Sequence, residues 1–265
     1  TMTRIAAHII TDSESVKREI SEHLHVAPEK ITAVPLAPRR AFQPVADTQA
    51  RAARQRLGVA DEFILFVGTV EPRKNLTTLV SAFEKLVADG QIACASNATR
   101  TQPAAATRSS FPRLVIAGRQ GWLTRSLSAR IEASPACALI HFTGYVSDEE
   151  LRALYASCLA FVYPSVYEGF GLPPLEAMSC GAAVVASRIQ AHLEILGEEN
   201  ALFVASGDAD GLARALSELI GDEGLRHRLA RSGRRRAAEF TWASAARLTL
   251  KVYERALTEW AAKKV

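Results

Sequence analysis

Short apolar runs alternate with longer amphipathic segments along most of the chain. Eight of these runs are short enough to be strands, and they span residues 5–10, 31–34, 63–68, 113–118, 138–144, 158–164, 182–187 and 201–205. Runs that are apolar almost throughout are typical of strands buried on both faces. Because helical segments separate them, the pattern predicts an α/β fold with a doubly wound parallel sheet from about residue 46 onward.

The segments between the runs carry helical signals. Apolar residues over 76–87 recur at the i, i+3, i+4 spacing of one helix face. Ser13 is the expected N-cap of a helix over 13–24, and Ser147 with Glu150 forms a capping box. Further helices are predicted at 208–220, 223–238 and 242–262.

Two regions break this alternation. Residues 89–111 are small and polar without a period, which predicts a flexible surface insertion. Residues 1–45 supply only a strand, a helix and a second strand before the proline-rich stretch PLAPRRAFQPV. Because three elements are too few for an independent domain, we expect this part to be the end of something larger.

Composition limits the class of protein. Hydrophobic residues make up 48% and charged residues 23%, as in soluble globular proteins, and no apolar run approaches the ~20 residues of a membrane helix. The first residues lack the layout of a signal peptide. The four cysteines have no C-x-x-C spacing, which indicates unpaired thiols in a reducing compartment. We therefore expect a cytoplasmic location.

The net charge is mildly positive. Lys and Arg number 32 against 28 Asp and Glu, a balance of +4, which suits an anionic ligand and does not indicate nucleic acid. The densest positive segment is RHRLARSGRRR at 226–236. We interpret it as a solvated helix face, and the alternative is a peripheral contact with an anionic lipid surface at the inner face of the membrane.

The candidate chemistry gathers in YEGFGLPPLEAMSCG, residues 167–181. This segment follows the strand at 158–164, and its Pro-Pro pair suits the first turn of a helix. It therefore places a strand-to-helix turn at the carboxyl edge of the sheet, where open α/β sheets bind ligands. Glycines allow close approach, and free N–H groups with the helix dipole favour an anion. The residues of this turn are Gly169, Phe170, Gly171 and Leu172.

Two carboxylates frame the turn. Glu176 falls early in the helix, where it can accept two hydrogen bonds from a vicinal diol such as a ribose. Glu168 precedes the turn and is placed to meet whatever is attached beyond the phosphates. For either acid alone a structural role is an equal alternative, Glu176 complementing the helix dipole and Glu168 lying on the surface. Their joint position around this turn favours a ligand site.

Cations that could balance these acids follow the strand FILFVG, in GTVEPRKNL. Gly68 and Thr69 make a tight exit from the strand, Arg73 and Lys74 supply charge, and Asn75 is expected to cap the following helix. This loop also lies at the carboxyl edge of the sheet. On their own, these basic residues would be read as exposed charges near a turn, but beside the first motif they indicate phosphate binding.

A family resemblance rests on four segments in this order: FVGTVEPRKNLTTLVSAFEKL, LVIAGRQGW, FTGYVSDEELRALYA and VYPSVYEGFGLPPLEAMSCGAAVVAS. They resemble the retaining glycosyltransferases of the two-Rossmann-domain (GT-B) type, in the group that includes sucrose synthase-like enzymes and bacterial polysaccharide mannosyltransferases. The most specific element is the E-x7-E pair. The resemblance implies a nucleotide-sugar-binding, Rossmann-like C-terminal domain at 46–240. It also implies a remnant of the acceptor-binding N-terminal domain with a linker at 1–45, and a helix returning toward that domain at 241–265.

The resemblance also implies roles for single residues. Glu176 would hold the ribose and Glu168 the donor sugar, while the amides of residues 169–172 would meet the diphosphate and the sugar. Many relatives place an arginine after the glycine that is Gly68 here, where this chain has Thr69, so the diphosphate would rely on Lys74 helped by Arg73. The loop Gly144, Tyr145 and Val146 would lie against the base.

The activity implied is transfer of a sugar with retention at its anomeric carbon. The expected donor is a GDP- or UDP-sugar, with GDP-mannose favoured, and the expected acceptor is a saccharide or a lipid-linked saccharide in polysaccharide synthesis. Glu168 and Lys74 would be the catalytic residues, and no cofactor is expected, because no cluster of His and acids has metal-ligand spacing.

Because the acceptor site would lie in a part of the family's fold that this chain lacks, we expect the isolated chain to be inactive and prone to self-association. The alternatives are a nucleotide-sugar 2-epimerase and a non-catalytic nucleotide-sugar-binding module completed by a partner chain.

Overall fold

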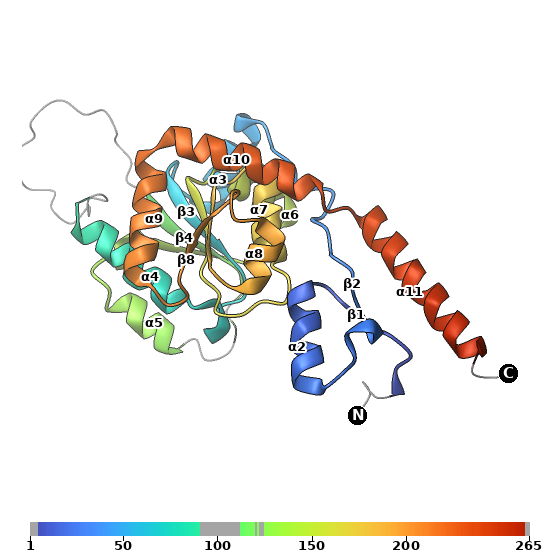
Figure 1. Cartoon of the computed structure of the whole chain (residues 1–265). Helices are drawn as coiled ribbons and strands as arrows, with labels where there is room; N and C mark the ends of the chain where they lie inside the picture. The colour runs from blue at the N-terminus through green and yellow to red at the C-terminus, as the bar shows by residue number, and fades with distance from the viewer. Residues whose placement is uncertain (1–4, 91–111, 120, 122–124, 263–265) are drawn as a thin grey trace, which may run out of the picture.

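A six-stranded parallel sheet forms the largest part of the molecule (Figure 1). In this computed structural model, which describes residues 5–90, 112–119, 121 and 125–262, the strand order is β5-β4-β3-β6-β7-β8. Because β3 and β6 are neighbours although two strands lie between them in sequence, the chain reverses its direction of winding there, and ligands of open sheets bind at such a point. The strands are β3 (Phe63–Val67), β4 (Arg113–Ala117), β5 (Ile140–Gly144), β6 (Ala160–Tyr163), β7 (Val184–Ser187) and β8 (Leu202–Val204).

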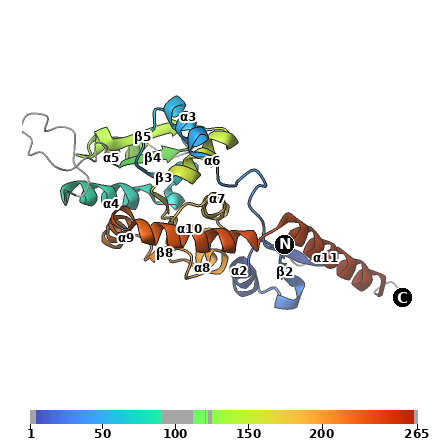
Figure 2. The ribbon, with the colours of Figure 1, turned by 90° about the horizontal axis from the view of Figure 1, so that it is seen from above.

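Helices cover both faces of this sheet. Figure 2 shows α3 and α6 on one side of the strands and α4 and α9 on the other, and the two helices of each pair contact each other. Helix α10 packs against α7. The helices are α3 (Asp47–Leu57), α4 (Leu76–Ala88), α5 (Arg125–Glu132), α6 (Asp148–Ser157), α7 (Leu172–Cys180), α8 (Gln190–Leu196), α9 (Ala209–Gly221) and α10 (Glu223–Ala238).

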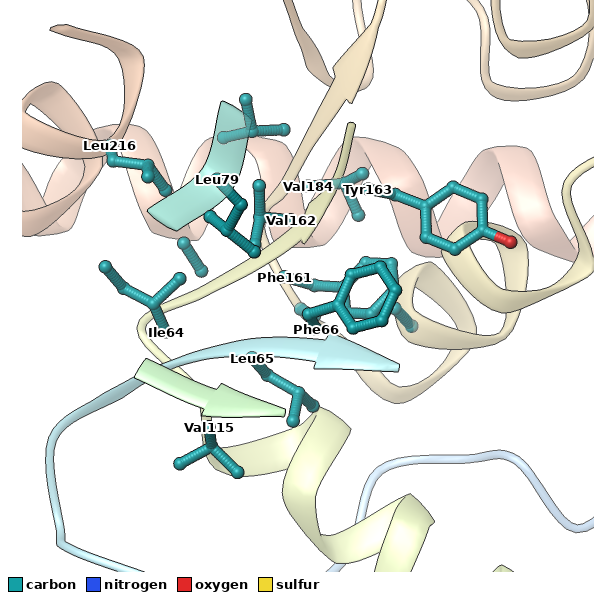
Figure 3. Packing of buried hydrophobic residues seen from close by; sticks show 14 of the residues in the cluster. Ile64, Leu65, Phe66, Leu79, Val115, Phe161, Val162, Tyr163, Val184 and Leu216 are labelled. Carbon is teal, nitrogen blue, oxygen red and sulfur yellow. The ribbon is translucent and has the colours of Figure 1, made fainter. Parts of the chain in front are cut away.

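The core lies between the central strands and these helices (Figure 3). Every residue from Phe63 to Phe66 of β3 is fully buried, as β strands covered on both faces should be. Aromatic rings continue the core toward the carboxyl edge, where Phe66 and Phe161 stack on Tyr163 with ring centroids 6.1 and 5.9 Å apart. The hydroxyl of Tyr163 points away from the cluster, so this residue connects the core to the edge of the sheet.

A second, smaller sheet lies apart from the first. It pairs β1 (Ile9–Thr11) with β2 (Ile31–Ala33) in parallel, and α2 (Glu14–Leu24) connects the two strands. The C-terminal helix α11 (Trp242–Ala262) runs away from the large sheet on the same side of the molecule (Figures 1 and 2). A groove of about 640 Å³ separates α11 from the small sheet, and its lining includes Ile10, Val34, Leu36, Trp242 and Leu250.

The side chains of Glu194 and Ser13 connect helix α2 to the part of the molecule that contains the large sheet. The carboxylate of Glu194 in α8 accepts the backbone N–H groups of Glu14 and Ser15 at 2.7 and 2.8 Å, so it caps the first turn of α2. The hydroxyl of Ser13 accepts the N–H of Val16 and donates to the carbonyl of Gly169 at 2.6 Å. The N-terminal segment therefore contacts the strand-to-helix turn that the sequence singled out.

Most of the predicted elements are confirmed. All eight strands are present, although the first begins only at Ile9, and both Ser13 and the capping box of Ser147 and Glu150 act as expected. Helices α3, α5 and α8 were not predicted. The cap at Asn75 is wrong, because this residue adopts a left-handed φ of 54° and its side-chain oxygen accepts the hydroxyl of Thr78 instead of a backbone N–H.

Three further expectations concern the surface insertion, the cysteines and membrane-spanning helices. The insertion predicted at 89–111 lies almost entirely outside the described residues. Cys137, Cys158 and Cys180 are free thiols, and Cys94 is outside the described residues. Among the described helices, we find none that is both long and apolar enough to cross a membrane.

The backbone of Gly118, directly after β4, packs against the backbone of Gly68, directly after β3, and this generates a stability prediction. Gly118 has a φ of 145°, and a Cβ at this position would lie 2.1 Å from the carbonyl oxygen of Gly68. We expect Gly118→Ala to lower the free energy of unfolding by more than about 2 kcal/mol, through strain and displaced backbone. Urea unfolding followed by circular dichroism measures this change.

Gly221→Ala is the matched control, because a Cβ there would meet nothing within 4 Å and the residue ends helix α9. This variant should stay within about 1 kcal/mol of the parent, on the stabilising side. Equal losses from the two substitutions would contradict the close packing of the glycines.

Candidate functional site

The two predicted carboxylates lie at the carboxyl edge of the sheet, where β6 leads into α7. Glu168 is only 8% exposed and Glu176 only 5% exposed. Gly171 precedes the helix with a φ of 101°, a value that favours glycine, and the Pro-Pro pair occupies the first turn as predicted. Burial of both acids argues against the simplest alternative for Glu168, that of a surface carboxylate.

Glu168 is held by cations from the loop that follows β3. Lys74 ends a short 3₁₀ turn (Pro72–Lys74), and its Nζ lies 2.6 Å from Oε1 of Glu168 and also donates to the hydroxyl of Tyr163. Arg73 donates to the other carboxylate oxygen at 2.7 Å and to the carbonyl of Tyr167 at 3.0 Å. The structure therefore brings together the two loops that the sequence proposed for one site.

Burial and ion pairing shift the pKa values of Glu168 and Lys74 in opposite directions. Burial raises the pKa of Glu168, but the hydrogen bond and charge of Lys74 and the charge of Arg73 outweigh it, so this pKa lies below its ordinary value. Burial lowers the pKa of Lys74, and Glu168 offsets only part of that effect. Glu168 is therefore ionised at neutral pH beside an ammonium that it shares with Tyr163.

Glu176 is paired with a residue that the sequence analysis did not assign. Nε and Nη2 of Arg39 donate to the two oxygens of Glu176 at 2.7 and 3.1 Å, which is a bidentate ion pair. Arg39 belongs to the proline-rich stretch between the two sheets, and its Nη1 also donates to Asp148. The only sequence signal was a pair of arginines in PLAPRRAFQPV, which carries no information about a partner 137 residues away.

The turn itself presents backbone to the site. The ring of Phe170 packs edge-on against Phe240 at 5.9 Å, and Leu172 packs against the core, so neither side chain can line a polar ligand site. Gly169 lies so close to Asp12 that a Cβ would come within 3.2 Å of its carboxylate. What the segment 169–172 can offer is therefore its amide groups at the N-terminus of α7.

His192 is a further buried residue beneath the turn. It is fully buried, its Nδ1 donates to the carbonyl of Ser187 at 2.8 Å, and a Cβ on Gly171 would lie 3.3 Å from its ring. Burial lowers its pKa, which the bond to Ser187 offsets only in part. The neutral imidazole limits how closely the backbone of the turn can pack at Gly171. The periodicity of the sequence could not have identified His192 as part of this site.

The remaining predicted positions lie along the same edge. Gly68 directly follows β3 and contacts Gly118, and Thr69 is exposed. Of the loop at 144–146, Tyr145 exposes 69% of its surface beneath the guanidinium of Arg119, which lies 4.9 Å from its ring centroid. Val146 is buried in the core, so only its backbone can meet a ligand. Apart from Gly144, which ends β5, these residues follow the carboxyl ends of β3 and β5, at the same edge of the sheet as Lys74.

Among the described residues, the acids away from this edge do not gather into a metal site. In the part of the chain that the structure describes, no group of three or more His, Cys, Asp or Glu is placed to hold a metal ion. The chain does contain one D-x-D sequence, Asp208-Ala209-Asp210. Asp208 caps helix α9 by accepting the N–H of Gly211, and Asp210 pairs with Lys85.

The ion pair of Lys74 with Glu168 yields a prediction about stability. Lys74→Met should cost about 2–3 kcal/mol at pH 7, less than the roughly 3–5 kcal/mol typical of breaking a buried pair, because Arg73 still contacts the carboxylate. Since the folded-state pKa of Glu168 lies below its unfolded value of about 4.3, the pairing stabilises the fold above that pH and is lost as the pH falls through the folded-state pKa. The difference between parent and variant in urea unfolding should therefore shrink below about pH 4.

Arg73→Met serves as the matched control, because 41% of this side chain is exposed. It should cost under about 1 kcal/mol. A control that loses as much as Lys74→Met would show that burial does not set the strength of these pairs.

Comparisons with known proteins agree with this geometry. Residues 48–236 match the family described as "Glycosyl transferases group 1". The chain is 31% identical to the O-antigen chain mannosyltransferase B of Escherichia coli over 247 residues, which are 93% of this chain and 60% of the relative. It is also 31% identical to the MMP alpha-(1->4)-mannosyltransferase of Mycolicibacterium hassiacum, covering 98% of this chain and 57% of the relative.

The fold has solved counterparts as well. The structure of Anabaena Alr3699/HepE in complex with UDP and glucose superposes with a TM-score of 0.78 at 18% identity, over 95% of this chain and 64% of that one. The chain thus spans about three fifths of the length of these relatives. Because the family match covers most of the large sheet with its helices, this chain belongs to the group 1 glycosyltransferases, and its six-stranded sheet is the Rossmann-like domain of a GT-B fold.

Proposed function

We propose that this chain is the donor-binding part of a retaining glycosyltransferase that uses a nucleotide-sugar, with GDP-mannose favoured as the donor. The acceptor would be a saccharide or a lipid-linked saccharide in polysaccharide synthesis. The observation that carries the proposal is the pair of buried carboxylates on either side of the N-terminus of α7, one of them bound to Lys74 and Arg73 from the neighbouring loop. Cations, amides and carboxylates at one edge suit a ligand with both phosphates and hydroxyl groups.

Each group then has a role that its position supports. The amides of 169–172 and the positive end of α7 would hold the diphosphate, and Lys74 with Arg73 would stabilise the charge that develops on it as the glycosidic bond breaks. Glu176 would accept hydrogen bonds from the ribose hydroxyls. Glu168, already ionised, would orient the sugar through its hydroxyl groups and stabilise positive charge near the anomeric carbon. No step in this scheme requires a metal ion.

The choice of donor rests on relatives. The two curated relatives described above are named as mannosyltransferases, which supports mannose, whereas the solved structure of HepE contains UDP and glucose. Polysaccharide synthesis is supported by the O-antigen chain relative. Tyr145 of the proposed base-binding loop is exposed and carries the guanidinium of Arg119 over its ring, so these two residues are the ones through which GDP and UDP would be distinguished.

Binding of the bare nucleotide tests the proposal first. We expect the 265-residue chain to bind GDP, UDP or ADP weakly in isothermal titration calorimetry without added metal, with GDP the tightest. The reason is that the loops carrying Lys74 and Glu176 are both within the described chain. If the folded chain shows no heat with any of the three, the donor site is excluded.

Substitution of each acid in turn should have different effects on nucleotide affinity. Glu176→Ala should weaken binding of the bare diphosphate by about 1.5–3 kcal/mol, the range for hydrogen bonds to a charged group. Glu168→Ala should leave that affinity nearly unchanged, because its partner in the proposal is the sugar. Calorimetry of both variants decides between these roles, and equal losses of nucleotide affinity would show that the roles are wrongly divided.

A further inference from the structure

We propose that Arg39 is a latch on the donor site, which competes with the ribose for the carboxylate of Glu176. The proposal rests on the function given above for Glu176. It makes the segment between the two sheets a regulator of nucleotide affinity, although none of its residues was expected to take part in binding.

The ion pair uses the part of Glu176 that a ligand would need. Both carboxylate oxygens accept from Arg39, and the acid is only 5% exposed. A vicinal diol also approaches a carboxylate with two parallel hydrogen bonds, the same geometry as a guanidinium. Because so little of the acid's surface remains accessible, the guanidinium has to withdraw before a ribose can take its place.

Two other groups can hold the guanidinium of Arg39 when it releases Glu176. Its Nη1 already donates to Asp148 at the N-terminus of α6, and its guanidinium lies 4.1 Å from the ring centroid of Phe42. The side chain is 45% exposed, so the core does not enclose it, and its contacts are with Glu176, Asp148 and the Phe42 ring. In the proposed withdrawal the bidentate pair breaks, and Asp148 and the Phe42 ring remain as partners of the guanidinium.

The backbone around Arg39 is held from two sides. The indole of Trp242, at the start of α11, donates to the carbonyl of Pro38 at 3.1 Å, and Arg152 of α6 donates to the carbonyl of Ala41 at 3.2 Å. Phe42 is buried against Tyr155, with ring centroids 5.8 Å apart. The latch is thus anchored both to the large sheet's helices and to α11, which runs along the small sheet, so a shift of α11 would move it.

The test compares ribonucleotides with nucleotides that lack the diol. GDP, UDP and ADP, each with its 2′,3′-dideoxy counterpart, are titrated calorimetrically into the parent chain and into Arg39→Ala. We expect the variant to bind the ribonucleotide at least about threefold tighter, the gain from removing an ion pair with one exposed partner. Affinity for the dideoxy form should not change. The neighbouring variant Arg40→Ala, which removes an exposed arginine of the same segment, should not tighten binding of either form.

Folding of the variant is controlled separately. Arg39→Ala leaves a buried carboxylate without its cation, so its melting temperature should fall while its nucleotide affinity rises. Arg39→Lys keeps a positive charge but cannot form the bidentate pair, and it should show the same tightening to a smaller extent. In the background of Glu176→Gln, Arg39→Ala should have no further effect on affinity.

Three results would overturn the latch. Unchanged or weaker binding of the ribonucleotide by folded Arg39→Ala and Arg39→Lys would show that Arg39 does not compete, and weaker binding would make it a ligand contact instead. Equal tightening for the dideoxy nucleotides would place the effect away from the ribose. Absence of binding to every folded variant, the parent included, would reject the donor site itself and the latch with it.

Discussion

A carboxylate that is removed from water must gain a cation, and the edge of the large sheet is built around two such acids. Glu168 and Glu176 are both buried, and each is matched by a cation from another part of the chain. An unpaired charge at either position would cost several kcal/mol. The requirement for compensation therefore joins the loop after β3, the turn before α7 and the segment between the sheets.

The two pairs differ in how firmly they are held. Lys74 is buried, donates to Tyr163 as well as Glu168, and stands on a 3₁₀ turn whose backbone bonds to the strand exit at Val166. Arg39 is half exposed and lies on an irregular segment. The first pair is thus a fixed part of the edge, whereas the second is the one that we propose a ligand can replace. Under the proposed function, this difference would separate a fixed phosphate region from a ribose region whose access Arg39 controls.

The sequence predicted the regular part of this arrangement well. Strands buried on both faces give continuous apolar runs, and the caps at Ser13 and Ser147 have local signatures, so these elements were recognised. Helix α3 was not, because it buries only Ala50 and Ala53 and therefore lacks an apolar stripe. Helix α8 has too few residues to establish a period. These helices depend on tertiary packing more than on their own pattern.

The candidate site was predictable to the same extent. Residues at the carboxyl ends of neighbouring parallel strands must meet at one edge, so Lys74 and Glu168 could be brought together from sequence. The pairing of Arg39 with Glu176 could not, because it depends on the path of an irregular segment across α6 and α7. For Asn75, residue type suggested a cap, but the turn after Pro72 imposes a left-handed backbone that points its side chain elsewhere. Local rules fail here where a neighbouring turn sets the geometry.

The central claim is that this edge binds a nucleoside diphosphate with its ribose at Glu176 and its diphosphate at Lys74 and the turn before α7. A crystal structure of the 265-residue chain soaked or grown with GDP tests it most directly. The account predicts ribose hydroxyls within hydrogen-bond distance of both Glu176 oxygens, Arg39 turned onto Asp148, and phosphate oxygens on the amides of 169–172. A nucleotide bound elsewhere, with Arg39 still paired to Glu176, would contradict it.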